Sequence, residues 1–141
     1  MIDCLIMGDS IAVGTQRYMN ECQIIGRKGI NSQQYNREHT INFKAKSVII
    51  SLGSNDHQGI KTKQELEKLR NRVDPNSKVF WIVPAINPEI QDIIKLIAEQ
   101  NHDTIVNIKK TEPDGVHPTW TGYRDIRQQI KDGNKETTNT K

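Results

Sequence analysis

Residues 47–56 read SVIISLGSND and contain the clearest strand of the chain. The run from Ser47 to Leu52 is rich in β-branched residues, which favour an extended backbone. Its apolar residues are continuous rather than alternating, a pattern typical of a strand that is buried on both faces. The polar residues that follow Gly53 indicate that the strand ends there and that a loop begins.

Four further apolar segments flank this strand, and segments with helical features separate them. The other strands are expected at residues 2–7, 22–25, 78–83 and 104–108, and helices at residues 11–20, 32–38, 62–73, 88–98 and 119–130. The clearest helix follows Asn87 as the predicted cap and has Pro88 at its first position. Thr62 and Glu65 predict a capping box at the start of the third helix.

The alternation of buried strands with helices predicts a parallel sheet that is covered by helices on both faces. We therefore predict an α/β fold, a flavodoxin-like three-layer α/β/α sandwich with a five-stranded parallel sheet in the strand order 2-1-3-4-5. Residues 1–131 are expected to form this single domain. Residues 132–141 are polar and charged, and we predict that they form a disordered tail.

Composition limits the classes of partner. The 141 residues suffice for one domain with a core, which must be mainly aliphatic because only 5% of the residues are aromatic. The formal net charge is +3 and basic residues are interspersed with acidic ones, so no nucleic-acid partner is predicted. No apolar run approaches the roughly 20 residues of a membrane span, and no signal peptide is recognised. The sequence therefore predicts a cytoplasmic protein with no membrane partner.

The cysteines and histidines give no indication of a metal site. Cys4 and Cys22 lie in or beside apolar runs, and we expect two buried, reduced thiols rather than a disulfide or a pair of metal ligands. The histidines are His39, His57, His102 and His117. They lack the spacing of a metal-binding motif such as His-Glu-x-x-His, so no metal is predicted.

Residues suited to chemistry follow four of the five predicted strands. Ser10 follows the first strand, Gly29 the second and Asn55 the third, while Asp114 and His117 follow the fifth. Because ligands bind outside the carboxyl ends of the strands in open parallel sheets, all of them are expected at one edge. The spacing of Asp114 and His117 allows the carboxylate to hold the imidazole Nδ1–H, which leaves Nε2 facing Ser10. As alternatives, Ser10 could be a helix cap, Asn55 a turn residue and Asp114 part of a solvated Asp-Gly turn.

Four short segments of the sequence combine glycine with serine, asparagine, aspartate or histidine. Residues 8–14 read GDSIAVG, residues 53–56 read GSND, and residues 114–118 read DGVHP, with Gly122-Tyr123 after them. In this order the segments resemble the sequence blocks of the GDSL, or SGNH, hydrolases, which include Gly-x-Asn-Asp and Asp-x-x-His. Residues 29–32, GINS, are similar to the family's Gly-x-x-Ser block.

The resemblance implies a role for each candidate residue. Ser10 would be the nucleophile, His117 the general base and then the general acid, and Asp114 the residue that orients His117. The N–H groups of Ser10 and Gly29, together with the side chain of Asn55, would form the oxyanion hole.

The resemblance also implies an enzyme that hydrolyses esters without a cofactor. The chain is short, its predicted connections are brief and polar, and the insertions that build large acyl pockets in longer family members are missing. We therefore expect a serine esterase that removes a small acyl group, such as acetyl, from a polar alcohol or a carbohydrate. The alternatives are a lysophospholipase or thioesterase on longer acyl chains, and a carbohydrate-binding module without turnover. Gly26 is the alternative to Gly29 in the oxyanion hole, and the natural substrate and the oligomeric state stay open.

Overall fold

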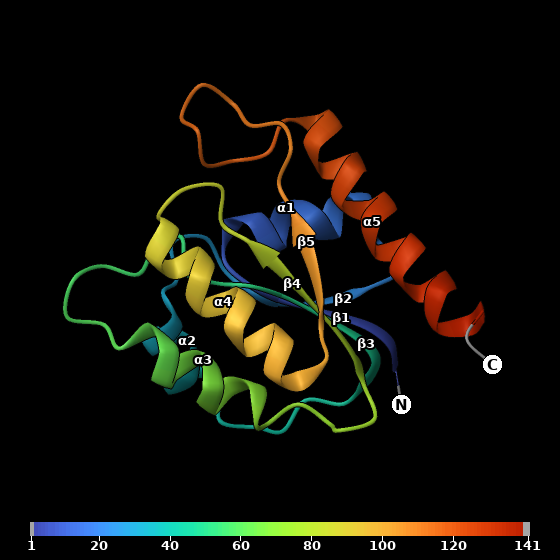
Figure 1. The fold of residues 1–141 in the computed structure, drawn as a ribbon, viewed down its shortest axis with the longest axis horizontal. Coiled ribbons are helices and arrows are strands. Elements are labelled where there is room, and N and C mark those ends of the chain that lie inside the picture. Colours follow the sequence, from blue (N-terminus) through green and yellow to red (C-terminus); the bar gives the residue numbers. More distant parts are fainter. Residues whose placement is uncertain (1, 140–141) are drawn as a thin grey trace.

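In the computed structural model, which describes residues 2–139, five parallel strands form one sheet in the order β2-β1-β3-β4-β5 (Figure 1). The strands are β1 (Ile2–Gly8), β2 (Gln23–Gly26), β3 (Ala45–Ser51), β4 (Lys78–Val83) and β5 (Thr104–Asn107). The helices are α1 (Ser10–Tyr18), α2 (Ser32–Glu38), α3 (Thr62–Arg70), α4 (Pro88–Asn101) and α5 (Trp120–Asn139). The predicted three-layer fold and the predicted strand order are thus confirmed.

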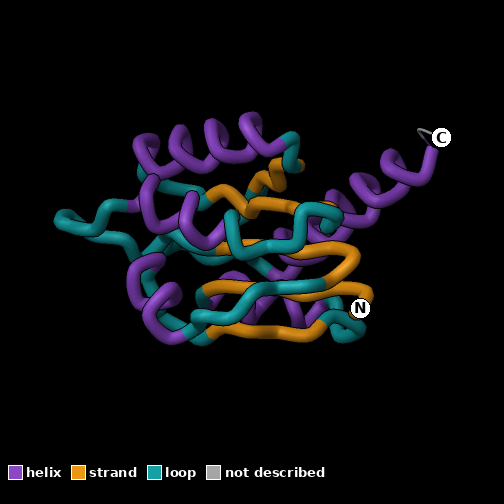
Figure 2. The backbone as a smooth tube through the Cα atoms, turned by 90° about the horizontal axis from the view of Figure 1, so that it is seen from below, coloured by secondary structure: helices purple, strands orange, loops and turns teal. Residues whose placement is uncertain are grey.

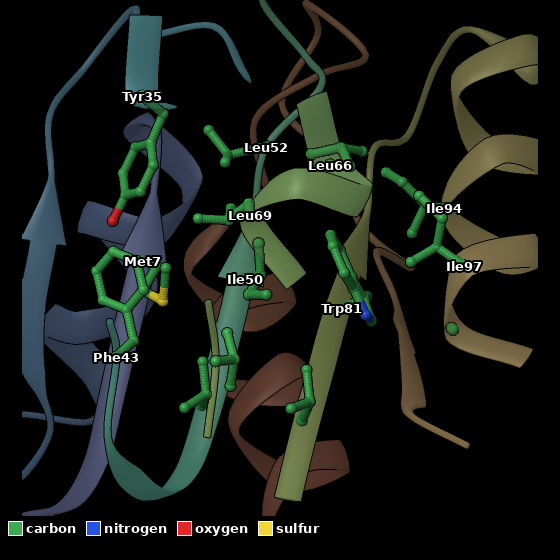
Figure 3. Packing of buried hydrophobic residues seen from close by; sticks show 14 of the residues in the cluster. Met7, Tyr35, Phe43, Ile50, Leu52, Leu66, Leu69, Trp81, Ile94 and Ile97 are labelled. Atoms are coloured by element: carbon green, nitrogen blue, oxygen red, sulfur yellow. The ribbon is translucent and has the colours of Figure 1, made fainter. Parts of the chain in front are cut away.

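Two apolar clusters fill the space on the two faces of the sheet. One lies under α2, α3 and α4 and includes Met7, Tyr35, Phe43, Ile50, Leu52, Leu66, Leu69, Trp81, Ile94 and Ile97 (Figure 3). The other lies under α1 and α5 and includes Ile6, Ile11, Ile49, Phe80, Val106, Ile126 and Ile130. Within β3, Val48 and Ile50 belong to the first cluster and Ile49 to the second, because successive side chains of a strand point to opposite faces. This two-sided burial explains why the strand is apolar without alternation.

The loops that follow β3 and β5 project from the same end of the molecule as the start of α1. The loop after β3, residues 52–61, extends away from the body of the protein (Figures 1 and 2). The loop after β5, residues 108–119, runs toward the start of α5 (Figure 1). None of the helices within the described residues is long and apolar enough to cross a membrane.

The capping box predicted from Thr62 and Glu65 is wrong. Lys61 occupies the cap position of α3 and makes no side-chain cap bond. Both predicted partners instead bind other segments: Thr62 Oγ1 donates to Asp56 Oδ2 at 2.7 Å, and Glu65 Oε1 accepts from Asn36 Nδ2 at 2.8 Å. Tertiary contacts have therefore replaced the local ones.

The prediction of two reduced thiols is also wrong, because Cys4 and Cys22 form a disulfide with a Cα–Cα distance of 4.6 Å. The pairing of β1 with β2 places Leu5 opposite Gln23, so Cys4 and Cys22, which directly precede these two residues, also come face to face. The bond therefore follows from the strand register, which the separation of the two cysteines along the sequence does not reveal.

Helix α5 passes residue 131, the predicted domain boundary, and continues to Asn139, so it includes residues 132–139 of the expected tail. Gly133 is buried against the ring of Phe80, and Ser47 Oγ donates to Asn134 Oδ1 at 3.1 Å. These contacts with β3 and β4 give a polar stretch a surface to pack on. Residues 140 and 141, the end of the predicted tail, lie outside the described residues.

Candidate active site

The turn between β1 and α1 places the Ser10 hydroxyl at the carboxyl edge of the sheet. Gly8, the last residue of β1, has a φ of +140°, and a Cβ at this position would lie 1.8 Å from the carbonyl oxygen of Ser51. Only glycine fits such a close approach in this conformation. The chain then turns at once, and Ser10 becomes the first residue of α1.

Asp9, not Ser10, caps helix α1. Asp9 Oδ1 accepts from the backbone N–H of Ile11 at 3.0 Å and of Ala12 at 3.4 Å, and from Ser51 Oγ at 3.1 Å. The Asp9 side chain is fully buried, and burial raises its pKa from 3.8 to about 6. Because Asp9 performs the capping, the alternative interpretation of Ser10 as the cap is wrong, and the serine hydroxyl is free for another partner.

That partner is His117. Ser10 Oγ lies 2.9 Å from His117 Nε2, although 107 residues separate the two in the sequence. On the other side of the imidazole ring, His117 Nδ1 lies 2.7 Å from Asp114 Oδ2. The three side chains therefore form a continuous hydrogen-bonded chain that joins the ends of β1 and β5. This is the arrangement that the sequence analysis expected for these residues.

The backbone around Asp114 determines which ring nitrogen of His117 carries the proton. Asp114 Oδ1 accepts from the N–H of Val116 at 2.8 Å and from the N–H of His117 at 3.0 Å. The pKa of Asp114 is lowered to about 2, mainly by the hydrogen bond from the Val116 N–H and then by the bond from the His117 ring. An ionised carboxylate can only accept, so Nδ1 is the donor, and in a neutral imidazole Nε2 is then the acceptor for the Ser10 hydroxyl. The Asp-Gly turn expected as an alternative is present and supports the imidazole.

Asn55 is held beside the segment that contains Gly29. Its Nδ2 donates one hydrogen bond to the carbonyl oxygen of Ile30 at 3.0 Å, and the second hydrogen of this amide group has no partner within the described residues. Gly29 lies beyond the end of β2 with a φ of +80° and open space around its Cα. Gly26 lies inside β2, where a Cβ would come within 2.2 Å of the carbonyl oxygen of Gly8. The bond to the carbonyl of Ile30 thus holds Asn55 next to the residue that follows Gly29.

Asp56 connects the loop of Asn55 to two helices, and the sequence analysis assigned it no such role. Its Oδ1 accepts from the N–H of Ser32 at 2.8 Å, while Oδ2 accepts from Ser32 Oγ at 2.5 Å and from Thr62 Oγ1 at 2.7 Å. These bonds fix the loop after β3 against the first residues of α2 and α3. The signal was present in residues 53–56, where the aspartate follows the asparagine directly, but its partners lie 24 and 6 residues away.

A cavity of about 650 Å³ lies beside Ser10 and His117, and its lining includes the aromatic rings of Tyr18, Trp120 and Tyr123. Tyr18 and Tyr123 stack with their ring centroids 5.5 Å apart. Trp120, the first residue of α5, also lines the cavity and is 60% exposed. This wall could not be expected from the loops that follow the strands, because its rings come from α1 and α5.

A second cavity, of about 800 Å³, lies between the loop after β3 and the start of α4. Its lining includes Asp56, Ile60, Ile90 and Ile93, but neither Ser10 nor Asn55. Among the side chains that the structure describes, those of residues 2–135, no group of three or more His, Cys, Asp or Glu is placed to hold a metal ion.

Comparison with known proteins identifies the architecture. No protein-family profile and no curated protein matches the chain. Among solved structures, a GDSL-like lipase from Bacteroides thetaiotaomicron is 22% identical with a TM-score of 0.72, and the match covers 96% of this chain and 89% of that one. The fold is that of the GDSL, or SGNH, hydrolases.

Other proteins with this SGNH fold act on different acyl substrates. The C-terminal catalytic domain of peptidoglycan O-acetyltransferase A from Streptococcus pneumoniae is 15% identical with a TM-score of 0.69, covering 96% of this chain and 94% of that one. A two-domain esterase active on acetylated mannans is 14% identical with a TM-score of 0.61, covering 99% of this chain and 50% of that one.

Proposed function

We propose that the protein is a serine ester hydrolase in which Ser10, His117 and Asp114 form a catalytic triad. The observation that carries this proposal is the hydrogen-bonded chain from Ser10 Oγ through both nitrogens of His117 to Asp114, with distances of 2.9 and 2.7 Å. A serine, a histidine and an ionised aspartate in this order are the requirements for activating a hydroxyl nucleophile.

In the first half of the proposed reaction, Ser10 Oγ attacks the carbonyl carbon of the ester while His117 Nε2 takes the hydroxyl proton. The tetrahedral intermediate then collapses, the bond to the alcohol oxygen breaks, and the imidazolium returns the proton to that oxygen. In the second half, His117 takes a proton from water, the hydroxide attacks the acyl-serine, and Ser10 leaves with its proton restored. Asp114 stabilises the imidazolium that forms in each half.

We propose that the oxyanion is bound by the N–H groups of Ser10 and Gly29 and by the free amide hydrogen of Asn55. Ser10 is the first residue of α1, where the Asp9 cap takes up the N–H groups of Ile11 and Ala12 but not that of Ser10, and the helix dipole favours negative charge. The bond from Asn55 to the carbonyl of Ile30 fixes the orientation of the amide next to Gly29. Donors that are already oriented in this way stabilise charge in the transition state without reorganising during the reaction.

For the substrate we propose a small acyl group, such as acetyl, esterified to a polar alcohol or a carbohydrate. An O-acetyltransferase domain and an esterase active on acetylated mannans share the fold, which supports this choice. The alternatives from the sequence, a lysophospholipase or thioesterase on longer acyl chains and a carbohydrate-binding module without turnover, make different predictions about turnover. The cytoplasmic location expected from the sequence is opposed by the Cys4–Cys22 disulfide, because disulfides persist mainly in oxidising compartments.

Labelling with a fluorophosphonate probe, followed by peptide mapping, tests the proposed nucleophile. We expect the probe to modify Ser10 alone and the Ser10→Ala variant to lose ester hydrolysis by about three orders of magnitude or more. Ser77→Ala is the matched control, because Ser77 donates to the carbonyl of Ala45 and does not line the cavity beside Ser10. If Ser10→Ala keeps its fold and more than about a tenth of the turnover, the triad is refuted. A wild-type protein that binds acetylated saccharides but is neither labelled nor active would be the binding module.

A further inference from the structure

His117 lines the cavity beside Ser10, whereas Asn55 does not. The lining of this cavity includes both Ser10 and His117 but neither of the other proposed oxyanion donors, Gly29 and Asn55. In the proposed reaction, His117 Nε2 must reach the oxygen of the departing alcohol in order to protonate it. The alcohol half of the ester therefore has to lie next to His117, and the cavity is the space available for it.

The walls of this cavity combine a flat aromatic surface with hydrogen-bonding groups. The guanidinium of Arg124 lies 5.6 Å from the ring centroid of Trp120, which holds this exposed ring in place by a cation–π contact. Burial is the main reason that the pKa of Tyr123 rises to about 12. Tyr123 is therefore a neutral phenol. Arg17, Lys28 and Glu112 also line the cavity, and none of the three forms an ion pair with a side chain of residues 2–135.

From these walls we propose that the cavity is a binding site for a sugar ring, which forms the alcohol half of the ester. The inference rests on the proposed esterase function and adds the class of alcohol to it. A pyranose has an apolar face of C–H groups that can lie on the Trp120 ring and a rim of hydroxyls that can pair with Arg17, Lys28 and Glu112. A cavity of about 650 Å³ falls within the usual size of small-ligand sites.

An apolar alcohol would be a poorer occupant of the same cavity. It could cover the ring of Trp120, but it would remove water from Arg17, Lys28 and Glu112 without offering them hydrogen bonds. Burying polar groups without new partners costs free energy, and for charged groups the cost is larger. The mixture of an exposed indole and unpaired charges therefore selects for a hydroxylated ring.

Three acetate esters that differ only in the alcohol separate this proposal from the general esterase function. They are a monoacetylated methyl glucoside, cyclohexyl acetate and ethyl acetate. We expect kcat/KM to be highest for the glucoside ester and the ratio of glucoside to ethyl ester to fall about tenfold in Trp120→Ala, the loss expected for one aromatic contact. Trp120→Phe should keep part of the ratio. Leu96→Ala is the control, because Leu96 is also exposed but lies on α4, and this variant should leave the ratio unchanged.

The outcome that overturns the sugar site is equal or better turnover of cyclohexyl acetate than of the glucoside ester, or an unchanged ratio in Trp120→Ala. Both results are compatible with Ser10-dependent hydrolysis, so they would leave the esterase proposal intact.

A binding measurement decides the proposal even without turnover. The protein has two tryptophans, of which Trp81 is fully buried and Trp120 is 60% exposed, so iodide quenches the fluorescence of Trp120 selectively. In the inactive Ser10→Ala variant, the monoacetylated methyl glucoside should protect Trp120 from quenching, and cyclohexyl acetate should protect it less. If wild-type protein shows no Ser10-dependent hydrolysis, the esterase proposal fails, while protection still supports the sugar site and its absence refutes it.

Discussion

Asp9 and Ser10 are neighbours in the chain but have opposite environments. The Asp9 carboxyl is fully buried beneath the start of α1, whereas the Ser10 hydroxyl points to His117 and lines a cavity. Asp9 Oδ2 has no hydrogen-bond partner within the described residues, while Oδ1 accepts from two backbone N–H groups and one hydroxyl. A buried carboxyl with one unpaired oxygen loses solvation when it ionises, which is the physical cause of its raised pKa.

This environment predicts a pH-dependent stability difference between wild type and Asp9→Asn. The folded pKa of Asp9 is about 6, above the ordinary 3.8, so the unfolded chain ionises first as the pH rises. Asp9 therefore lowers the stability of the wild type as the pH rises from about 4 to about 6, and the cost is complete above that range. Asparagine can cap the helix but does not titrate.

Urea unfolding at several pH values measures this difference. The stability of Asp9→Asn relative to wild type should rise by on the order of 2–3 kcal/mol between about pH 4 and pH 7. A difference that stays constant over this range would contradict the raised pKa, and one that falls would mean that the ionised form is stabilised by the fold.

Asn55 supplies a second prediction at the scale of single residues. Removal of one oxyanion donor costs about 2.7–4 kcal/mol in the transition state, so Asn55→Ala should lower kcat by about 100-fold to 1,000-fold with little change in KM. Steady-state kinetics on a nitrophenyl acetate ester measures both constants, and thermal unfolding checks that loss of the bond to Ile30 has not disturbed the fold. A large rise in KM at constant kcat would instead make Asn55 a substrate-binding residue.

Among the structural elements, the parallel pairing of β1 with β2 brings Cys4 and Cys22 together. The disulfide closes a loop of 18 residues that contains α1, the helix that begins with Ser10. Such a closure stabilises a protein mainly by limiting the conformations of the unfolded chain. The disulfide therefore supports the segment that carries the proposed nucleophile without contacting the site.

Removing the disulfide should lower stability more than activity. For a loop of this size the loss is about 3 kcal/mol, so the double variant Cys4→Ser, Cys22→Ser should melt about 10 °C lower than wild type. Alkylation before and after reduction counts the free thiols, and zero before reduction with two after it is expected. Two reactive thiols in the untreated wild-type protein would contradict the bond, as would an unchanged melting temperature in the double variant.

The comparison of sequence with structure shows which elements were predictable. Apolar runs and the i, i+3, i+4 pattern act locally, so the five strands and most helix starts could be located from the sequence. The side chain of Thr62 could not be placed, because its partner Asp56 lies outside the helix. Likewise, residues 132–139 look polar by themselves, and the surface on which Gly133 packs comes from β4. The features that could not be predicted from the sequence therefore depend on contacts between different helices and strands.

The candidate site was predictable to the same degree. Ser10, His117 and Asp114 were identified because they follow strands and match family motifs, and the carboxyl ends of parallel strands meet at one edge. Trp120 and Tyr123 fall within the helix predicted at residues 119–130, and neither of them was predicted to line a cavity. Their place in the cavity depends on how α5 packs against α1, where their neighbour Tyr18 lies.

At the scale of the whole molecule, the space around the site predicts which acyl groups are accepted. We propose that the cavity beside Ser10 holds the alcohol half of the ester. The larger cavity is lined by neither Ser10 nor Asn55. A long acyl chain gains about 0.8 kcal/mol for each CH₂ that it buries, but only where apolar walls cover it. The larger cavity offers Ile60, Ile90 and Ile93 among charged groups such as Lys61 and Glu89, so we expect a preference for short acyl chains.

The acyl preference is measured as kcat/KM for nitrophenyl acetate, butyrate and octanoate below the concentrations at which micelles form. Acetate should be the best substrate after correction for the intrinsic reactivity of each ester. If octanoate exceeds acetate, the larger cavity holds the acyl chain, and the lysophospholipase or thioesterase alternative takes the place of the short-acyl proposal. Ile90→Asp would then be expected to abolish the advantage of octanoate.

The separation of 107 residues along the sequence between Ser10 and His117 also has a consequence for the protein during its synthesis. The ribosome releases the nucleophile early, but the imidazole and the carboxylate leave it only with the last quarter of the chain. Under the proposed mechanism, a nascent or truncated chain has a serine without a base and cannot cleave esters before β5 and its following loop have joined the sheet. Turnover thus reports assembly of the entire sheet, and two fragments divided in the loop after β3 would recover activity only by reassociating.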